Sequence, residues 1–92
     1  MGVRDLFDMT GKVALITGAG GLLGPKHAEA IIECGGTAVI TDHHIERAEE
    51  KARMLNDKYG PGSAVPYWMD VTNKESISAV VNDLDRLDVL IN

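Results

Sequence analysis

The sequence has little of what marks a disulfide-linked, membrane-spanning or nucleic-acid-binding protein. Its single cysteine, Cys34, has no partner for an internal disulfide and forms no metal-binding cluster. The longest apolar runs are far shorter than the roughly 20 residues that a membrane helix needs, and charged residues such as Arg4 and Asp5 stand where a signal peptide would be apolar. A net charge of −5 argues against a nucleic-acid partner. We therefore expect a cytoplasmic protein that binds neither nucleic acid nor a membrane.

What the sequence does contain is an alternation of short apolar runs with longer amphipathic stretches. Thr72 is expected to open the last of three helices, because Glu75 stands three residues later in a capping-box pattern. Pro66 lies inside the third apolar run and predicts an edge strand there, since proline has no N–H to donate. The expected strands are 12–17, 37–41, 64–69 and 87–92, and the first two helices are 22–34 and 45–59.

This order of elements predicts the fold class. Strands that alternate with helices form right-handed crossovers, which place the strands parallel in one sheet and cover both of its faces. The expected fold is α/β, a three-layer Rossmann-type parallel sheet with strand order 3-2-1-4 that stops after the fourth strand. The chain has no internal repeat, low-complexity segment or linker, so it is one domain or part of one.

Four glycines, Gly18, Gly20, Gly21 and Gly24, gather between the first strand and the first helix. Ligands of such sheets bind at the carboxyl ends of the strands, and the free amides at the start of a helix attract an anion. Gly18 allows a tight turn, Gly20 or Gly21 lets a pyrophosphate approach the backbone, and Gly24 lets the helix pack closely on the sheet. The alternative is a glycine-rich turn without a ligand, because such motifs also occur by chance.

Asp42 ends the second strand, 24 positions after Gly18, near the offset expected of an acid that binds an adenosine ribose. A carboxylate there accepts hydrogen bonds from both ribose hydroxyls and repels a 2′-phosphate, which favours NAD over NADP. The alternative role for Asp42 is to cap the helix that starts near Ile45.

Three further residues fall on the same rim of the predicted sheet. Asp70 and Val71 follow the third strand and are candidates to contact an adenine, although Asp70 could equally be an ordinary polar loop residue. His43 could touch the edge of the adenosine or remain a solvated loop residue. Asn92 ends the fourth strand, where its amide could bridge backbone groups. We expect no metal at His43 and His44, because side chains of adjacent residues diverge and no third ligand is near.

Together these residues resemble the short-chain dehydrogenase/reductase family. The stretch TGKVALITGAG resembles the family's first strand and turn, and Asp42, DVT and LDVLIN follow in the expected order. The resemblance implies backbone contacts to the cofactor at Gly18, Gly21 and Leu23, the ribose on Asp42, and the adenine beside Asp70 and Val71. It also implies hydride transfer between NAD and an alcohol or carbonyl group of a small-molecule substrate, in an intact protein that forms a homo-oligomer.

The chain departs from the family in two respects. Leu22 stands where the compact branch has glycine, and the spacing of Gly18, Gly21 and Gly24 fits the extended branch, which includes nucleotide-sugar epimerases and dehydratases. Neither Tyr59 nor Tyr67 is followed four residues later by the lysine that the family's catalysis uses, so we assign no catalytic residue and no metal ligand. We interpret residues 1–92 as the incomplete amino-terminal part of a single dinucleotide-binding domain. The alternatives are a fragment of an NAD-using epimerase or dehydratase, and a stand-alone NAD-binding module.

Overall fold

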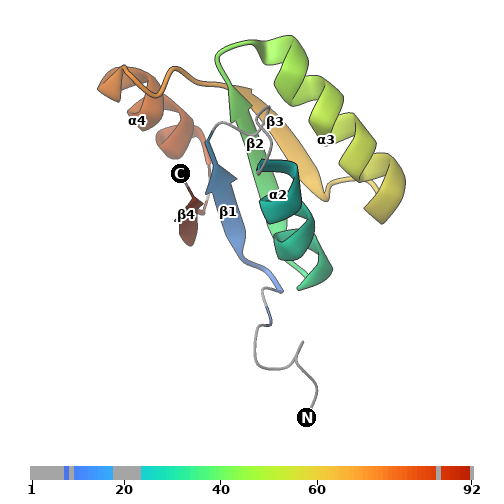
Figure 1. The fold of residues 1–92 in the computed structure, drawn as a ribbon. Helices are drawn as coiled ribbons and strands as arrows, with labels where there is room; N and C mark the ends of the chain where they lie inside the picture. Colours follow the sequence, from blue (N-terminus) through green and yellow to red (C-terminus); the bar gives the residue numbers. More distant parts are fainter. Residues whose placement is uncertain (1–7, 9, 18–23, 85, 92) are drawn as a thin grey trace.

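The computed structural model describes residues 8, 10–17, 24–84 and 86–91, and in this part of the chain strands and helices alternate (Figure 1). Three helices accompany four strands that form one sheet. The elements are β1 (Val13–Ile16), α2 (Gly24–Glu33), β2 (Thr37–Asp42), α3 (Ile45–Tyr59), β3 (Ala64–Trp68), α4 (Lys74–Asp83) and β4 (Val89–Ile91).

The sheet is parallel, and its strand order is β3-β2-β1-β4. In the register, Ile16 of β1 lies beside Ile40 of β2 and beside Ile91 of β4. The predicted order 3-2-1-4 is therefore confirmed for the described strands. Because all four strands run the same way, their carboxyl ends meet at one edge of the sheet, here called the carboxyl rim.

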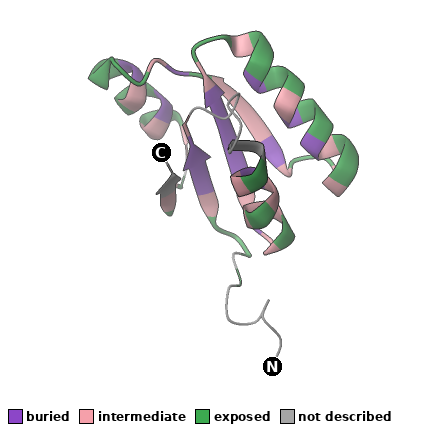
Figure 2. Cartoon of the chain, in the orientation of Figure 1, coloured by how far each residue is buried: buried purple, intermediate pink, exposed green. Residues whose placement is uncertain are grey.

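Alternate residues of the central strands face opposite layers, as the strand period of two requires. Ile16 and Ile40 pack toward α2 and α3, where alanines let the helices come close to the sheet. Leu15 and Val39 face the other way and pack with Met69 and with Val80 of α4. Figure 2 shows the result: buried residues in the central strands and exposed residues on the outer sides of the helices. The three-layer arrangement is thus confirmed.

Within the described residues, the bounds of the helices and strands differ from the predicted ones by a few residues at most. The structure starts β1 one residue later, extends β2 to Asp42, ends β3 at Trp68 and starts β4 at Val89. Helix α2 ends at Glu33, and Cys34 separates it from Gly35 and Gly36. Gly35 has a φ of +93° and its N–H donates to the Ile32 carbonyl, a helix end that suits glycine.

The predicted start of α4 is wrong by one residue. Asn73, not Thr72, caps the helix, and its side-chain oxygen accepts from the N–H groups of Glu75 and Ser76. Thr72 is engaged elsewhere, because its hydroxyl and its N–H both donate to Asp70. The capping box expected between Thr72 and Glu75 is therefore replaced by an asparagine cap.

The edge position predicted for β3 is confirmed, since β2 is its only neighbour among the described strands. The Met69 N–H donates to the Asp42 carbonyl, so by the alternation of a strand Pro66 points its nitrogen away from β2. Proline thus occupies a position where no ladder hydrogen bond is lost. Trp68, at the end of β3, is 52% exposed.

Candidate functional site

The carboxyl rim brings together the ends of β1, β2 and β3 and the loops that follow β2 and β3 (Figure 1). Of the residues predicted to bind a cofactor, Asp42, His43, Asp70 and Val71 lie here in the described structure. Gly18, Gly20, Gly21, Leu23 and Asn92 lie outside the described residues. Helix α2 begins at Gly24, so its first turn follows directly on the glycine-rich stretch.

Asp42 is held in place through one of its two carboxylate oxygens. Its side chain is only 8% exposed, and Oδ1 accepts the His44 N–H at 2.8 Å. No described residue donates to Oδ2, so that oxygen keeps its capacity to accept. The N-cap of α3 is His44, without a side-chain hydrogen bond at the cap. The alternative in which Asp42 caps the helix is therefore wrong.

Thr41 is a residue of this rim that the sequence analysis missed. It is 1% exposed, and its hydroxyl donates to the Ile16 carbonyl at 2.7 Å. This bond ties the end of β2 to the last residue of β1, directly before the glycine-rich stretch. A threonine between an apolar strand and an aspartate was the available signal, because a buried hydroxyl needs a partner.

His43 is the exposed neighbour of Asp42. Its side chain is 65% exposed, and Nδ1 lies 3.7 Å from Asp42 Oδ1. The ring lies against the His44 ring with centroids 4.0 Å apart. On the other side, the Trp68 indole donates to the His43 carbonyl at 2.9 Å, which fixes the backbone of this loop to the end of β3. The described residues contain no group of His, Cys, Asp or Glu arranged to hold a metal.

Asp70 forms a tight loop with Thr72. Its Oδ1 accepts the Thr72 hydroxyl at 2.7 Å and the Thr72 N–H at 3.0 Å. These bonds, with a smaller contribution from the charge of His43, hold the pKa of Asp70 below its ordinary value. The Asp70 N–H donates to the buried hydroxyl of Ser76, which ties the loop to α4. Val71 beside it is 57% exposed and free to pack on a ligand.

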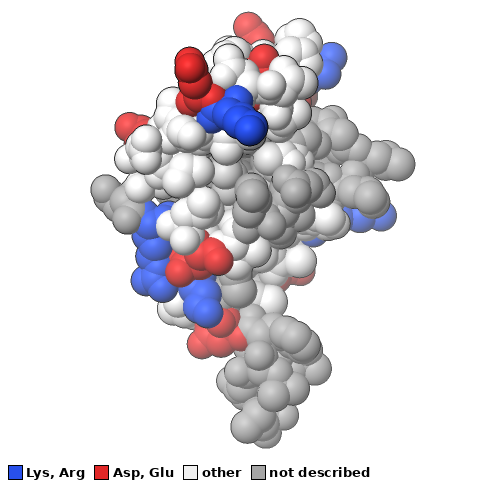
Figure 3. Space-filling model, turned by 90° about the vertical axis from the view of Figure 1, so that its left-hand side faces the viewer, with Lys and Arg blue, Asp and Glu red and all other residues white. Residues whose placement is uncertain are grey.

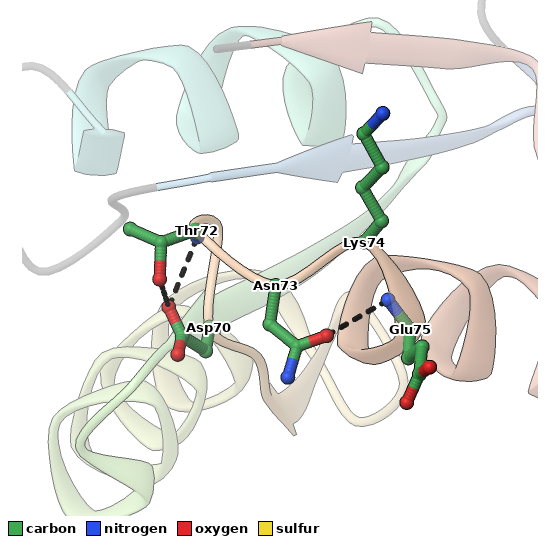
Figure 4. A pocket seen from close by; sticks show the side chains of 5 residues that line it. All are labelled: Asp70, Thr72, Asn73, Lys74 and Glu75. Atoms are coloured by element: carbon green, nitrogen blue, oxygen red, sulfur yellow. Dashed lines mark hydrogen bonds between the residues drawn. The ribbon is translucent and has the colours of Figure 1, made fainter.

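A shallow hollow of 530 Å³ opens beside this loop. Figure 4 shows that Asp70 turns toward Thr72, whereas the Lys74 ammonium points away from it. The residues that line the hollow are Asp70, Thr72, Asn73, Lys74 and Glu75. Its walls thus carry both signs of charge.

Acidic and basic side chains also alternate on the side of the molecule shown in Figure 3. Arg86 and Asp88 form an ion pair, with Nε and Oδ2 2.7 Å apart. Among the described residues, no helix is both long and apolar enough to cross a bilayer.

A parallel sheet of order β3-β2-β1-β4 with an acid at the end of β2 defines a Rossmann-type nucleotide-binding fold. The family model for short chain dehydrogenases matches residues 12–92. The chain belongs to the short-chain dehydrogenase family.

Relatives and solved structures agree with this membership. Sorbose reductase SOU1 of Candida albicans is 37% identical over 84 residues, which are 91% of this chain and 29% of that protein. A 7α-hydroxysteroid dehydrogenase solved with NADH is 28% identical, with a TM-score of 0.84 over 100% of this chain and 37% of the other. A gluconate 5-dehydrogenase of Burkholderia cenocepacia solved with NADP is 29% identical, with a TM-score of 0.83 over 97% of this chain and 36% of the other.

Two facts follow from these matches. The chain spans about a third, or less, of the relatives' length. Members of the family bind nicotinamide cofactors, and the same fold accommodates NADH in one relative and NADP in another. Since the matching model is that of the short chain dehydrogenases, the nucleotide-sugar epimerase or dehydratase alternative is not favoured.

Proposed function

We propose that residues 1–92 are the amino-terminal, NAD-binding part of an oxidoreductase. The complete enzyme would transfer hydride between NAD and an alcohol or carbonyl group of a small molecule, and it would act as a homo-oligomer in the cytoplasm. Family membership and the partial coverage of every reported relative support this proposal. The 92 residues would then be one incomplete dinucleotide-binding domain.

The observation that carries the proposal is the position and hydrogen bonding of the Asp42 carboxylate. This carboxylate stands at the end of β2, its Oδ1 is held by the His44 N–H, and no described residue donates to Oδ2. Two vicinal ribose hydroxyls are the donors that suit such a carboxylate, and each charge-assisted bond contributes about 1.5–3 kcal/mol. A 2′-phosphate at the same place would meet a fixed negative charge. NAD is therefore the proposed cofactor in preference to NADP.

The other residues of the rim complete the proposed adenosine site. The amides of Gly18, Gly20, Gly21 and Leu23 would hold the pyrophosphate at the start of α2, where the helix dipole favours an anion. Asp70 and Val71 would contact the adenine, Val71 through its exposed side chain. His43 would lie at the edge of the adenosine, and Asn92 would bridge backbone groups beside β4. When bound, the nicotinamide would accept or donate the hydride.

The two tyrosines of the chain have other roles in the structure. Tyr67 donates to Asp83 of α4, and Tyr59 lies 3.4 Å from Glu33 at the end of α2. Their hydroxyls thus connect elements of the fold. We propose that the acid/base tyrosine and its lysine belong to the part of the enzyme beyond residue 92.

The test uses the full-length protein that carries this segment. Asp42→Ala should raise the Kd for NAD about tenfold, which corresponds to about 1.4 kcal/mol, and should reduce the preference for NAD over NADP. Titration calorimetry with both cofactors measures both effects. Asp57→Ala is the matched control, because Asp57 is an exposed aspartate of α3. An unchanged cofactor preference in the Asp42 variant would sink the proposal.

A further inference from the structure

His43 lies close to the carboxylate of Asp42 on the carboxyl rim. Its Nδ1 lies 3.7 Å from Asp42 Oδ1, and its charge also acts on Asp70, on the loop after β3. With a side chain that is 65% exposed, His43 is open to solvent and to any ligand that Asp42 binds. An imidazole in this position changes the net charge of the rim when it takes up a proton.

The backbone that carries His43 is fixed from both sides. The Trp68 indole donates to the His43 carbonyl at 2.9 Å, and the next N–H, that of His44, donates to Asp42 at 2.8 Å. The imidazole therefore starts from an anchored loop next to the proposed ribose-binding carboxylate. These two bonds fix the backbone of His43 relative to Asp42.

We propose that His43 is a residue that determines cofactor specificity and makes the choice between NAD and NADP depend on pH. The inference rests on the proposed function, in which Asp42 binds the adenosine ribose. With a neutral imidazole, Asp42 alone faces the 2′ position and repels a phosphate there. With an imidazolium, a cation stands beside Asp42 and pairs with the 2′-phosphate of NADP. Lower pH thus raises the affinity for NADP relative to NAD.

The other charged groups near this loop do not produce the same effect. The bonds from Thr72 hold the pKa of Asp70 below its ordinary value, so its charge does not change in the pH range of a histidine. The first turn of α3 adds Glu46 and Arg47, one charge of each sign. His44 is the other histidine of this loop, and the stretch 18–23 contains no ionisable side chain.

The experiment measures the Kd of the full-length protein for NADP and for NAD between about pH 8 and pH 5.5, the range in which histidine titrates. The variants are His43→Gln, His43→Arg and, as the matched control, His44→Gln. The 2′-phosphate itself takes up a proton near pH 6, and the His43→Gln profile isolates that contribution.

On lowering the pH, the ratio of the NADP Kd to the NAD Kd should fall about fivefold further in the wild type than in His43→Gln, the size of one exposed charge-assisted contact. His44→Gln should follow the wild type. His43→Arg should show the lower ratio already at pH 8, because its charge is permanent.

Two outcomes would overturn the inference: a His43→Gln profile equal to that of the wild type, or a pH effect that His44→Gln removes instead. Failure of the proposed function is a separate result, seen as unchanged NAD binding and preference in Asp42→Ala. If Asp42→Ala weakens NAD binding while His43→Gln keeps the wild-type profile, only the role of His43 is refuted.

Discussion

The carboxylate and amide side chains at the two ends of the strands bind partners at different separations along the chain. At the amino ends, Asp88 accepts the N–H of Val13, a residue 75 positions away, and Asn56 binds both the N–H and the carbonyl of Ala64. At the carboxyl rim, the carboxylates of Asp42 and Asp70 bind groups only two residues away.

This difference assigns separate roles to the two ends of the sheet: the bonds at the amino ends stabilise the fold, and the carboxylates at the rim serve ligand binding. Long-range bonds at the amino ends join different elements, so their loss weakens the whole fold. The bonds of the two rim carboxylates each shape a single loop, and Thr41 and Trp68 join the elements there instead. The comparison predicts that substitutions at the amino ends lower the stability of the protein, whereas substitutions at the rim change ligand binding.

The largest expected effect is that of Asn56→Ala at the amino end of β3. Asn56 donates to the Ala64 carbonyl at 3.0 Å and accepts its N–H at 2.8 Å, and Ala64 is 3% exposed. Leaving both backbone groups unpaired should lower the free energy of unfolding by about 1–3 kcal/mol. Urea denaturation of the full-length protein measures it, with Asp57→Ala as the exposed control. A loss no larger than the control's would break the comparison.

A smaller loss of stability is expected for Asp88→Asn, and the size of this loss depends on pH. Arg86, and then the Val13 N–H, hold the pKa of Asp88 below its ordinary value of 3.8. Folding therefore favours the carboxylate, and this stabilisation is complete above pH 3.8 and is lost as the pH falls through the lower native pKa.

Melting temperatures measured from pH 7 down to below pH 3.8 test the prediction. Asp88→Asn should melt below the wild type at pH 7, and the gap should close in acid. Arg86→Gln should give a similar loss at pH 7, and the double variant should melt close to either single variant, because both remove the same ion pair. Additive losses would show that the pair is not the source.

The smallest effect is expected at the rim itself, for Asp70→Asn. The amide oxygen still accepts from Thr72, so the unfolding midpoint should match that of the wild type at pH 7. The KM for NAD should rise about twofold to threefold, as for the loss of one exposed contact. Glu75→Gln, in the same hollow, is the control and should leave the KM unchanged. A lowered midpoint with an unchanged KM would place Asp70 with the stabilising residues.

The sequence predicted the fold well because the apolar pattern decides it. The stripe from Ile45 to Tyr59 and the β-rich runs 13–16 and 37–41 specify buried faces, and the helix and strands form there. The position at which a helix starts depends instead on which of several polar side chains accepts the hydrogen bond from a backbone N–H of its first turn. At α4 the pattern favoured Thr72, but Asp70 takes its hydroxyl and Asn73 caps the helix.

The sequence predicted which residues lie at the candidate site better than it predicted the hydrogen bonds that they form. The spacing of Asp42 and Asp70 after apolar runs placed both at the rim, as the structure shows. The bond from Thr41 to Ile16, and the one from Trp68 to the His43 carbonyl, join residues that only the sheet register brings together. A buried threonine signals that its hydroxyl needs a partner, but which partner it finds cannot be deduced from a single sequence.

Pro66 has a consequence for how this sheet meets other chains. The outer side of β3 lacks one donor in the middle of its row, so a strand that docked there would leave one of its own carbonyls without a partner. The sheet is therefore extended less readily on this flank. Intermolecular pairing of the kind that starts aggregates is disfavoured at this edge, even with the Trp68 indole exposed beside it.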